Sequence, residues 1–316
     1  MHRLALAQAV LLVLVVILAL PIAFRSMGIV LTERQEHTLY EFPGGAALSG
    51  EDADALEQIE TFFNIAAIEL DEAGGNISLA VSGHRICDDA CPTLDLTLFS
   101  LDDDAEIRRA LPPSATINLK PEDEVFSTTV NLPVRGQPSL YPFDEYTLWM
   151  GLTLAIELDG ERVFLDETSI TDHADITVQN QLRDYTMAPP LTLNLADVQG
   201  MNDPLDFLGA QRLYFDRPVH MEIMTVLLVT LIAVSAVLAI ALRGVSDLIV
   251  GIGGLVLGIW GVRSVLVPQP LPVVTSVDLA LSVIILFVLL GLSVRTAQHF
   301  HQQSDLPPLK IRRRKP

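Results

Sequence analysis

The stretch from Tyr141 to Gly160, YPFDEYTLWMGLTLAIELDG, decides the fold of the region around it. From Tyr146 to Leu158 a large apolar residue occupies every second position, which is the period of a strand with one buried face. Asp159-Gly160 follows directly and is a strong signal for a tight hairpin turn, after which Val163 to Leu165 begins a return strand. The stretch therefore predicts a long β-hairpin.

Further short strands, separated by turn residues, surround this hairpin. We predict them at Phe63 to Leu70, Ile77 to Val81, Leu94 to Leu98, Ser114 to Lys120, Val125 to Leu132, Ile176 to Tyr185, Leu191 to Leu195 and Gln211 to Phe215. Two helical pieces, Glu51 to about Phe62 and Asp102 to Leu111, start with acidic residues that suit a helix N-terminus. Many short strands with Gly and Pro turns predict an antiparallel β-sandwich over residues 25–218.

Apolar stretches long enough to cross a bilayer flank this domain. Half of the 316 residues are hydrophobic and the mean hydropathy is +0.41, which is high for a soluble domain. We predict one N-terminal and three C-terminal transmembrane helices, at Leu4 to Phe24, Ile223 to Leu242, Leu248 to about Val267 and about Val273 to Val294. The first stretch is longer than the core of a cleaved signal peptide and lacks a small-x-small cleavage site, which favours an uncleaved anchor.

Basic residues near the membrane ends predict the orientation. If four spans alternate, the N-terminus (residues 1–3), Arg243 and the basic tail (residues 295–316) share one face, which we expect to be cytoplasmic. Residues 25–218 are then extracytoplasmic and carry 35 acidic and 11 basic residues, a net charge of −24. We therefore expect a multi-pass protein of the plasma membrane. The net charge of −19 on the whole chain excludes nucleic acid as its main partner.

Small and charged residues within the predicted spans suggest how the helices associate. Spacings of three, four and three residues place four glycines of the third span on one helix-packing face: Gly251, Gly254, Gly258 and Gly261. Arg263 and Asp278 lie near the outer ends of neighbouring spans, so we expect an ion pair that closes the hairpin between them. An ion-conducting or signal-transmitting role for this pair is the alternative.

Candidate chemical groups are few, and each has a structural explanation. Cys87 and Cys91 are the only cysteines, and in an exterior compartment we expect a disulfide between them; a metal site with Asp88 or His84 is the alternative. The acidic run of Asp102, Asp103, Asp104 and Glu106 is more typical of a helix start than of a calcium loop. We predict no catalytic residue, no resident metal and no cofactor, because none of the common catalytic or phosphate-binding motifs occurs.

The motif Tyr141-Pro142-Phe143-Asp144 is the most distinctive segment, and we predict a structural corner there. Proline fixes the backbone before the long strand, and Asp144 can bond turn amides. This motif leading to Tyr146, Arg217-Pro218 before the second span, and Gly261-Val262-Arg263 with the proline-rich loop and Asp278 resemble an uncharacterised family of membrane proteins with a domain of unknown function. That resemblance implies location and shape but no activity.

A second, partial resemblance is to pentameric ligand-gated channels, which also place an F-P-x-D-like turn in an external β-sandwich followed by closely spaced helices. This chain departs from them, since an anchor precedes the sandwich, no fourth helix fits after Val294, and the third span has glycine and aliphatic residues where polar pore rings are expected.

The leading functional hypothesis is a non-enzymatic interaction or sensory module, partnered by the lipid bilayer and by an envelope protein or a second copy. A channel or transporter subunit is the alternative. A hydrolase using Asp172, His173 and Asp175 is a remote third.

Overall fold

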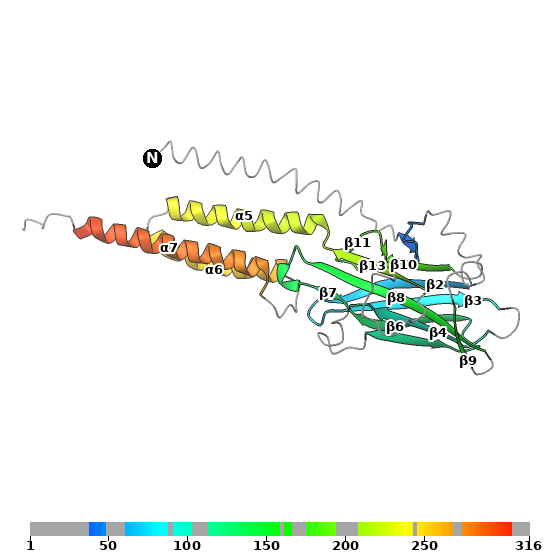
Figure 1. Cartoon of the computed structure of the whole chain (residues 1–316). Coiled ribbons are helices and arrows are strands. Elements are labelled where there is room, and N and C mark those ends of the chain that lie inside the picture. Colours follow the sequence, from blue (N-terminus) through cyan, green and yellow to red (C-terminus); the bar gives the residue numbers. More distant parts are fainter. Residues whose placement is uncertain are drawn as a thin grey trace, which may run out of the picture. The chain divides into compact units, whose positions relative to one another are not determined.

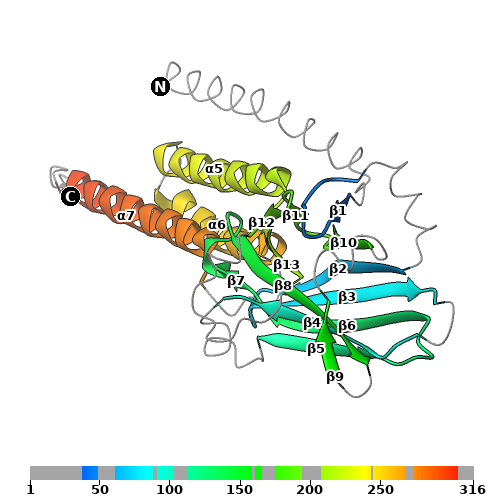
Figure 2. The same cartoon turned by 45° about the vertical axis from the view of Figure 1, so that its right-hand side comes forward.

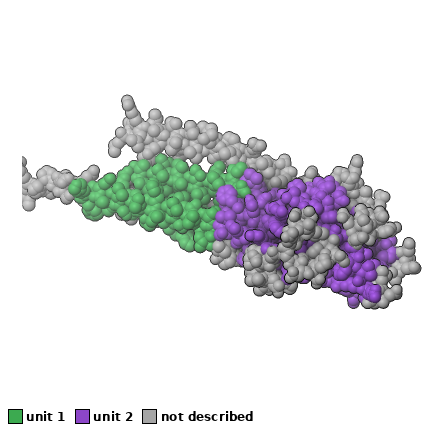
Figure 3. Space-filling view, in the orientation of Figure 1, with its two compact units in different colours: residues 1–28, 222–270, 274–316 green, residues 29–221, 271–273 purple. Residues whose placement is uncertain are grey.

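The computed structural model describes residues 38–48, 61–87, 91–102, 113–158, 161–165, 175–193, 208–242, 245–267 and 274–304. The chain divides into two compact units. One, the β unit, comprises residues 29–221 and 271–273, and the other, the helical unit, comprises residues 1–28, 222–270 and 274–316. Figure 3 shows the helical unit in green and the β unit in purple.

The β unit contains two sheets that enclose one hydrophobic core (Figure 1). Sheet A has the strand order β1 (Leu39–Glu41), β10 (Asp175–Asn180), β2 (Thr61–Asp71), β3 (Asn76–Arg85) and β6 (Val125–Pro133). Sheet B has the order β11 (Thr186–Met187), β13 (Gly209–Asp216), β8 (Glu145–Leu158), β4 (Leu94–Ser100) and β5 (Ser114–Leu119). Three short strands lie off this path: β12 (Leu191–Thr192) pairs with β13, while β7 (Arg135–Gly136) and β9 (Glu161–Phe164) pair with β8.

The period-two pattern of the long strand accounts for the core of sheet B. On β8, the alternate residues Tyr146, Leu148, Met150, Leu152 and Leu154 are each at most 1% exposed and belong to the core. Strand β9 follows as the predicted return strand and pairs antiparallel with β8. The prediction of a β-rich fold with two packed sheets is therefore confirmed.

The prediction of wholly antiparallel sheets is wrong at one pair, because β10 runs parallel to β2. The preceding strand β9 belongs to sheet B, so the chain changes sheets before β10 and enters sheet A without a hairpin. Strand β10 also ends at Asn180, earlier than the predicted end at Tyr185. The reason is local, since the Asn180 side chain accepts a hydrogen bond from the Leu182 amide (3.0 Å) and donates one to the Tyr185 carbonyl (2.8 Å).

Other differences lie at the ends of predicted elements. Strand β2 already begins at Thr61, so the last two residues of the helix predicted from Glu51 to about Phe62 are strand; the rest of that prediction lies outside the described residues. The predicted helix from Asp102 to Leu111 lies outside them too, apart from Asp102 itself. The short strands β1, β7 and β11 were not predicted.

The described part of the helical unit contains α5 (Val219–Leu242), α6 (Val245–Leu266) and α7 (Ser276–Ser304); α5 starts in the last residues of the β unit. Two segments, Val219–Ala241 and Ser276–His301, are long and apolar enough to cross a membrane, and only 11% and 17% of their most apolar windows are buried. The apolar part of α6 is shorter, Gly251–Ser264. The predicted span from Leu4 to Phe24 and most of the basic tail, residues 305–316, lie outside the described residues.

Candidate functional site

The Tyr141–Asp144 motif forms a buried corner at the start of β8. A short 3-10 helix (Pro138–Leu140) precedes it, the Tyr141–Pro142 peptide is cis, and the Phe143 amide donates to the Leu140 carbonyl (2.9 Å). Tyr141, Pro142 and Asp144 are buried, whereas Phe143 is 49% exposed. The corner therefore directs the Asp144 carboxylate into the protein just before the long strand begins.

Arg217 is the residue that meets this carboxylate. It follows the end of β13, and only Pro218 separates it from α5. Its side chain is 1% exposed, and that of Asp144 is fully buried. Arg217 Nε donates to Asp144 Oδ1 (3.1 Å) and Oδ2 (3.3 Å), while Nη2 donates to Oδ2 (3.1 Å). Bonding from two nitrogens fixes the guanidinium plane as well as its position.

Glu72 supplies a second carboxylate to the same guanidinium. Arg217 Nη2 also donates to Glu72 Oε1, and the Glu72 side chain is 15% exposed. Glu72 lies in the turn between β2 and β3, where Gly75 has a φ of 65°, a left-handed conformation that favours glycine. Asp71 Oδ1 accepts the Gly74 amide (2.8 Å) in that turn. The turn thus presents Glu72 to Arg217 across 145 residues of sequence.

Aromatic rings enclose the guanidinium on further sides. Arg217 Cζ lies 4.3 Å from the Tyr185 ring centroid and 4.9 Å from that of Tyr141. The Tyr185 hydroxyl donates to Glu72 Oε1 (2.6 Å), and the Tyr146 ring meets the Tyr185 ring edge-on at 5.5 Å. We call Glu72, Tyr141, Asp144, Tyr185 and Arg217 the Arg217 cluster.

The electrostatics of the Arg217 cluster favour a permanently charged arginine. Burial opposes the charge, but the hydrogen bonds to Asp144 and the neighbouring negative groups outweigh it and raise the pKa of Arg217 above its ordinary value. Burial also raises the pKa of the Tyr146 and Tyr185 hydroxyls. The carboxylate of Asp144 is hydrogen-bonded by Arg217 and closed to solvent, so this pair links the start of β8 to the end of β13.

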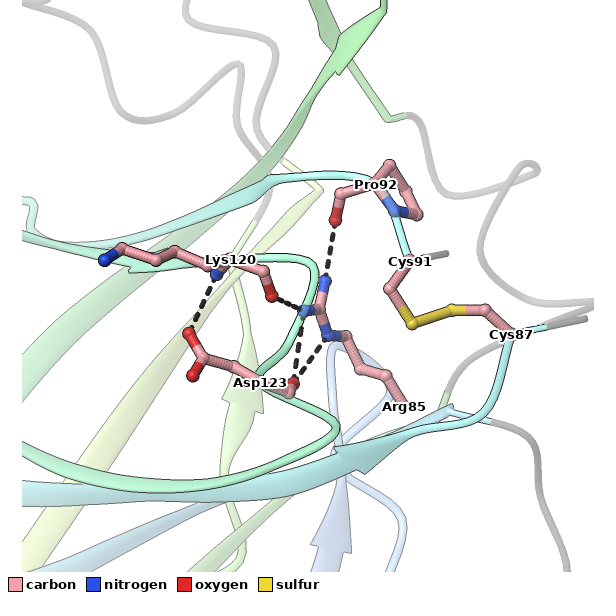
Figure 4. Close-up of a disulfide and its surroundings, with 6 residues drawn as sticks. All are labelled: Arg85, Cys87, Cys91, Pro92, Lys120 and Asp123. Carbon is pink, nitrogen blue, oxygen red and sulfur yellow. Dashed lines mark hydrogen bonds between the residues drawn. A yellow bond between two sulfur atoms is a disulfide. The ribbon is translucent and has the colours of Figure 1, made fainter. Parts of the chain in front are cut away.

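A second buried arginine lies beside the disulfide (Figure 4). Cys87 and Cys91 are joined to each other, so their sulfurs are not free thiolates and the alternative of a thiolate metal site does not apply. Arg85 is 4% exposed and donates to the main-chain carbonyls of Pro92 (2.9 Å), Lys120 (2.6 Å) and Asp123 (3.1 Å from Nη2). Burial lowers the pKa of Arg85 against the opposing effect of Asp123. Arg85 therefore links the segment before β4 to the turn between β5 and β6.

Arg263 and Asp278 pair within the helical unit. Arg263 Nε donates to Asp278 Oδ1, and Nη2 donates to Oδ2 (3.2 Å), which links α6 to α7. Asp278 Oδ2 also accepts the Thr275 amide (3.0 Å), and the Asp278 amide donates to Thr275 Oγ1 (3.3 Å). These reciprocal bonds form a capping box at the start of α7, which begins at Ser276, so Asp278 both caps that helix and binds Arg263 of α6.

The glycine face predicted for helix packing lies on α6 from Gly251 to Gly261. A Cβ atom added at Gly254, Gly258 or Gly261 would meet no described atom within 4 Å. The close approach is made by Gly291 of α7, where a Cβ would lie 2.8 Å from Ile240 Cδ1 of α5. Gly291 was missed by sequence reasoning because it stands outside the regular spacing of the α6 glycines.

The remaining candidate groups do not assemble into a site in the described structure. Asp88, Asp103, Asp104, Glu106, Asp172 and His173 lie outside the described residues. Asp175 begins β10, and burial raises its pKa. Within the described ranges, no three His, Cys, Asp or Glu side chains are grouped to hold a metal ion.

Comparison with known proteins covers the middle of the β unit. Residues 93–195 match the family model described as Domain of unknown function (DUF4436). The match confirms the expected resemblance to an uncharacterised family, and it includes the Tyr141–Asp144 motif and Tyr185 but neither Glu72 nor Arg217. No curated protein matches the chain.

Sequence reasoning singled out Asp144 and noticed Arg217-Pro218, yet it did not join them. It gave neither Glu72 nor Tyr185 a place in a site. The only available signal was that a basic residue directly before an apolar helix requires a partner if it is buried. The partner itself depends on the sheet topology, which local patterns do not contain.

Proposed function

We propose that this chain is a multi-pass protein of the cell membrane that presents its acidic β-sandwich outside the cell and acts as a non-enzymatic interaction or sensory module. In this proposal both termini are cytoplasmic, and the predicted N-terminal anchor joins the three C-terminal helices in the bilayer. The single observation that carries it is the Arg217 cluster, whose arginine is separated only by Pro218 from a helix apolar enough to span a membrane.

The cluster suits a module that holds or reports a bound state. Arg217 donates hydrogen bonds to Glu72 in the β2–β3 turn and to Asp144 in the corner before β8. A displacement of either turn therefore moves the backbone of Arg217, from which the chain continues through Pro218 into α5. A buried arginine held by two carboxylates is costly to disturb, so this point transmits a displacement instead of absorbing it.

The partners follow from the surface chemistry. The exposed apolar side chains of α5 and α7 suit lipid, since the helical segments bury little of their surface within the described protein. The net charge of −24 predicted for the exterior repels nucleic acid and anionic lipid. The remaining candidates are an envelope protein and a second copy of the chain.

Cysteine labelling on intact cells tests the orientation. The parent chain is a blank, because its two cysteines are joined to each other. With a membrane-impermeant maleimide, Gln181→Cys, at an exposed position of the β unit, should react on intact cells. Ser304→Cys, at the end of α7, should react only after the membrane is permeabilised. The reverse pattern would overturn the proposal.

Native mass spectrometry in mild detergent separates the module from the channel alternative. A single copy, a pair of copies, or one copy with a different protein supports an interaction module. A closed ring of several copies would overturn that function and favour the channel subunit.

A further inference from the structure

Strand β6 is the last strand of sheet A among the described residues, and so it forms an edge there. It runs for nine residues, Val125–Pro133, and pairs with β3 from His84↔Val125 to Asn76↔Pro133 without a register shift. Figure 2 shows β6 alongside β3 at the border of the sheet. Among the described strands, none pairs with the other side of β6.

The hydrogen bonds at the two ends of the ladder show which backbone groups are unpaired. The Arg85 amide donates to the Glu124 carbonyl (2.8 Å), and the Val134 amide donates to the Gly75 carbonyl (2.9 Å). Because bonding direction alternates along an antiparallel strand, the even-numbered residues of β6 face β3. The odd-numbered residues Val125, Ser127, Thr129 and Asn131 therefore direct their amides and carbonyls away from the sheet, roughly 7 Å apart.

Nothing in β6 protects this edge. Natural sheets protect edges by keeping them short, by charged side chains, by proline or by bulges. At the other border of sheet A, β1 is short, with three residues. In sheet B, the short strand β9 at the edge carries the charged residues Glu161 and Arg162. Strand β6 has no charged residue, and its proline stands only at the last position. Its outward side chains are exposed, Val125 by 80%.

We propose that β6 pairs antiparallel with β6 of a second copy, with Thr128 on the two-fold axis. This register places Val125 opposite Asn131 and Ser127 opposite Thr129, so every outward amide and carbonyl of these four residues gains a partner. Shifting the register by two residues in either direction leaves some of these groups unpaired. The inference deepens the proposed interaction module by naming its partner as the same chain.

The side chains also match in this register. Phe126 of one copy faces Val130 of the other on the inner face, an aromatic and β-branched pair that stabilises sheets. On the outer face, Ser127 faces Thr129, two small hydroxyl residues that hydrogen-bond well across strands. No residue of β6 meets one of like charge.

Charge favours a second copy over other extended segments. Because the strands run in opposite directions, the acidic turn Glu122–Glu124 of one copy lies opposite the uncharged residues Leu132, Pro133 and Val134 of the other. The two acidic turns are then at opposite ends of the paired strands, about 30 Å apart and beyond the screening length at physiological salt. In a domain predicted to carry −24, an uncharged edge is where two copies approach with little repulsion.

Disulfide trapping of the full-length chain in detergent tests the register. Thr128→Cys should form an intermolecular disulfide on mild oxidation, because directly opposed residues of a non-bonded pair lie about 4.5 Å apart at Cα. Ser127→Cys alone should not, because its nearest copy is diagonal at about 7–8 Å. A mixture of Ser127→Cys and Thr129→Cys chains should cross-link. Equal cross-linking by all single variants would overturn the register.

Charge at the edge tests the pairing itself. The double variant Ser127→Lys/Thr129→Lys places lysines opposite each other and should raise the dimer dissociation constant by about tenfold or more in sedimentation equilibrium. Gln181→Lys, away from β6, should leave it unchanged. A cooperative melt at a protein concentration below the dissociation constant, where the dimer no longer contributes to stability, shows that each variant folds. Three results would each overturn the proposal. The chain could be monomeric at every concentration, the dimer dissociation constant could be unchanged by the two lysines, or a different protein could bind at β6. Topology labelling is independent of these readouts, so either proposal can fail alone.

Discussion

Replacing Asp144 with asparagine removes one charge from the Arg217 cluster with almost no change in shape. The side chain is fully buried and accepts bonds from two nitrogens of Arg217 at 3.1–3.3 Å. Asparagine keeps one oxygen acceptor but turns an amino group toward the guanidinium. The variant therefore measures what the charge at Asp144 contributes to the stability of the β unit.

The expected cost follows from the burial of the pair. Breaking a buried ion pair by removing one partner typically costs about 3–5 kcal/mol, because the other charge stays buried. Glu72 still contacts Arg217, so we place Asp144→Asn at the lower end, about 3 kcal/mol. For a domain of this size, that corresponds to a fall in melting temperature of about 6–12 °C.

Tryptophan fluorescence can isolate the β unit in the intact protein. The chain has two tryptophans, Trp149 on β8 and Trp260 on α6, so a Trp260→Phe background leaves Trp149 as the reporter. Asp95→Asn is the matched control, since Asp95 pairs with Arg162, whose side chain is 51% exposed. An exposed pair contributes at most about 1 kcal/mol, so this control should shift the melt by no more than about 4 °C.

A double-mutant cycle makes the reasoning refutable. Arg217→Met removes the cation and leaves the carboxylates of the buried Asp144 and the half-buried Glu72 without it. Combined with Asp144→Asn, it should cost less than the sum of the single changes by about 1.5 kcal/mol or more. If Asp144→Asn melted within about 2 °C of the parent, or if the two costs were additive within about 0.5 kcal/mol, the cluster would not hold the chain as argued.

Three further predictions address other parts of the protein. The double variant Cys87→Ser/Cys91→Ser should lose about 2 kcal/mol in denaturant titrations of the non-reduced protein, as expected for a short closed loop. Burial raises the pKa of Asp216, so the folded state resists its ionisation; Asp216→Asn should raise the melting temperature at pH 7, and the gain should disappear as the pH falls through the ordinary carboxyl range. Gly291→Val should destabilise the helices in circular-dichroism melts, whereas Gly258→Ala, which meets no described atom, should not.

Local periodicity was sufficient to predict most strands of the β unit. Alternation from Tyr146 to Leu158 placed β8 to within one residue, since a one-sided core selects every second side chain. It did not predict the parallel pairing of β10 with β2. Pairing direction depends on which sheet the preceding strand belongs to, and no window of adjacent residues contains that information.

The candidate site was less predictable than the fold. The Tyr141–Asp144 motif was recognisable as a corner because proline and aspartate have local backbone effects. Its contact with Arg217 spans 73 residues, and the contact of Arg217 with Glu72 spans 145. Only the assembled sheets bring these groups together. The sequence can indicate that Arg217, if buried, needs an anionic partner, but it cannot identify which of the 35 acidic residues of the predicted exterior is that partner.

A single strand, β3, lies between the β6 edge and the turn that contributes Glu72 to the Arg217 cluster. Strand β6 pairs with β3 from Asn76 to His84, and β3 begins at Asn76, four residues after Glu72 in the turn that contacts Arg217. A second copy paired to β6 should therefore restrain β3 and then this turn. Amide hydrogen exchange above and below the dimer dissociation constant should show slower exchange in β3 and in residues 71–76 in the dimer. Protection confined to β6 would mean that the bound state does not reach Arg217, and the module would then be an attachment surface and not a sensor.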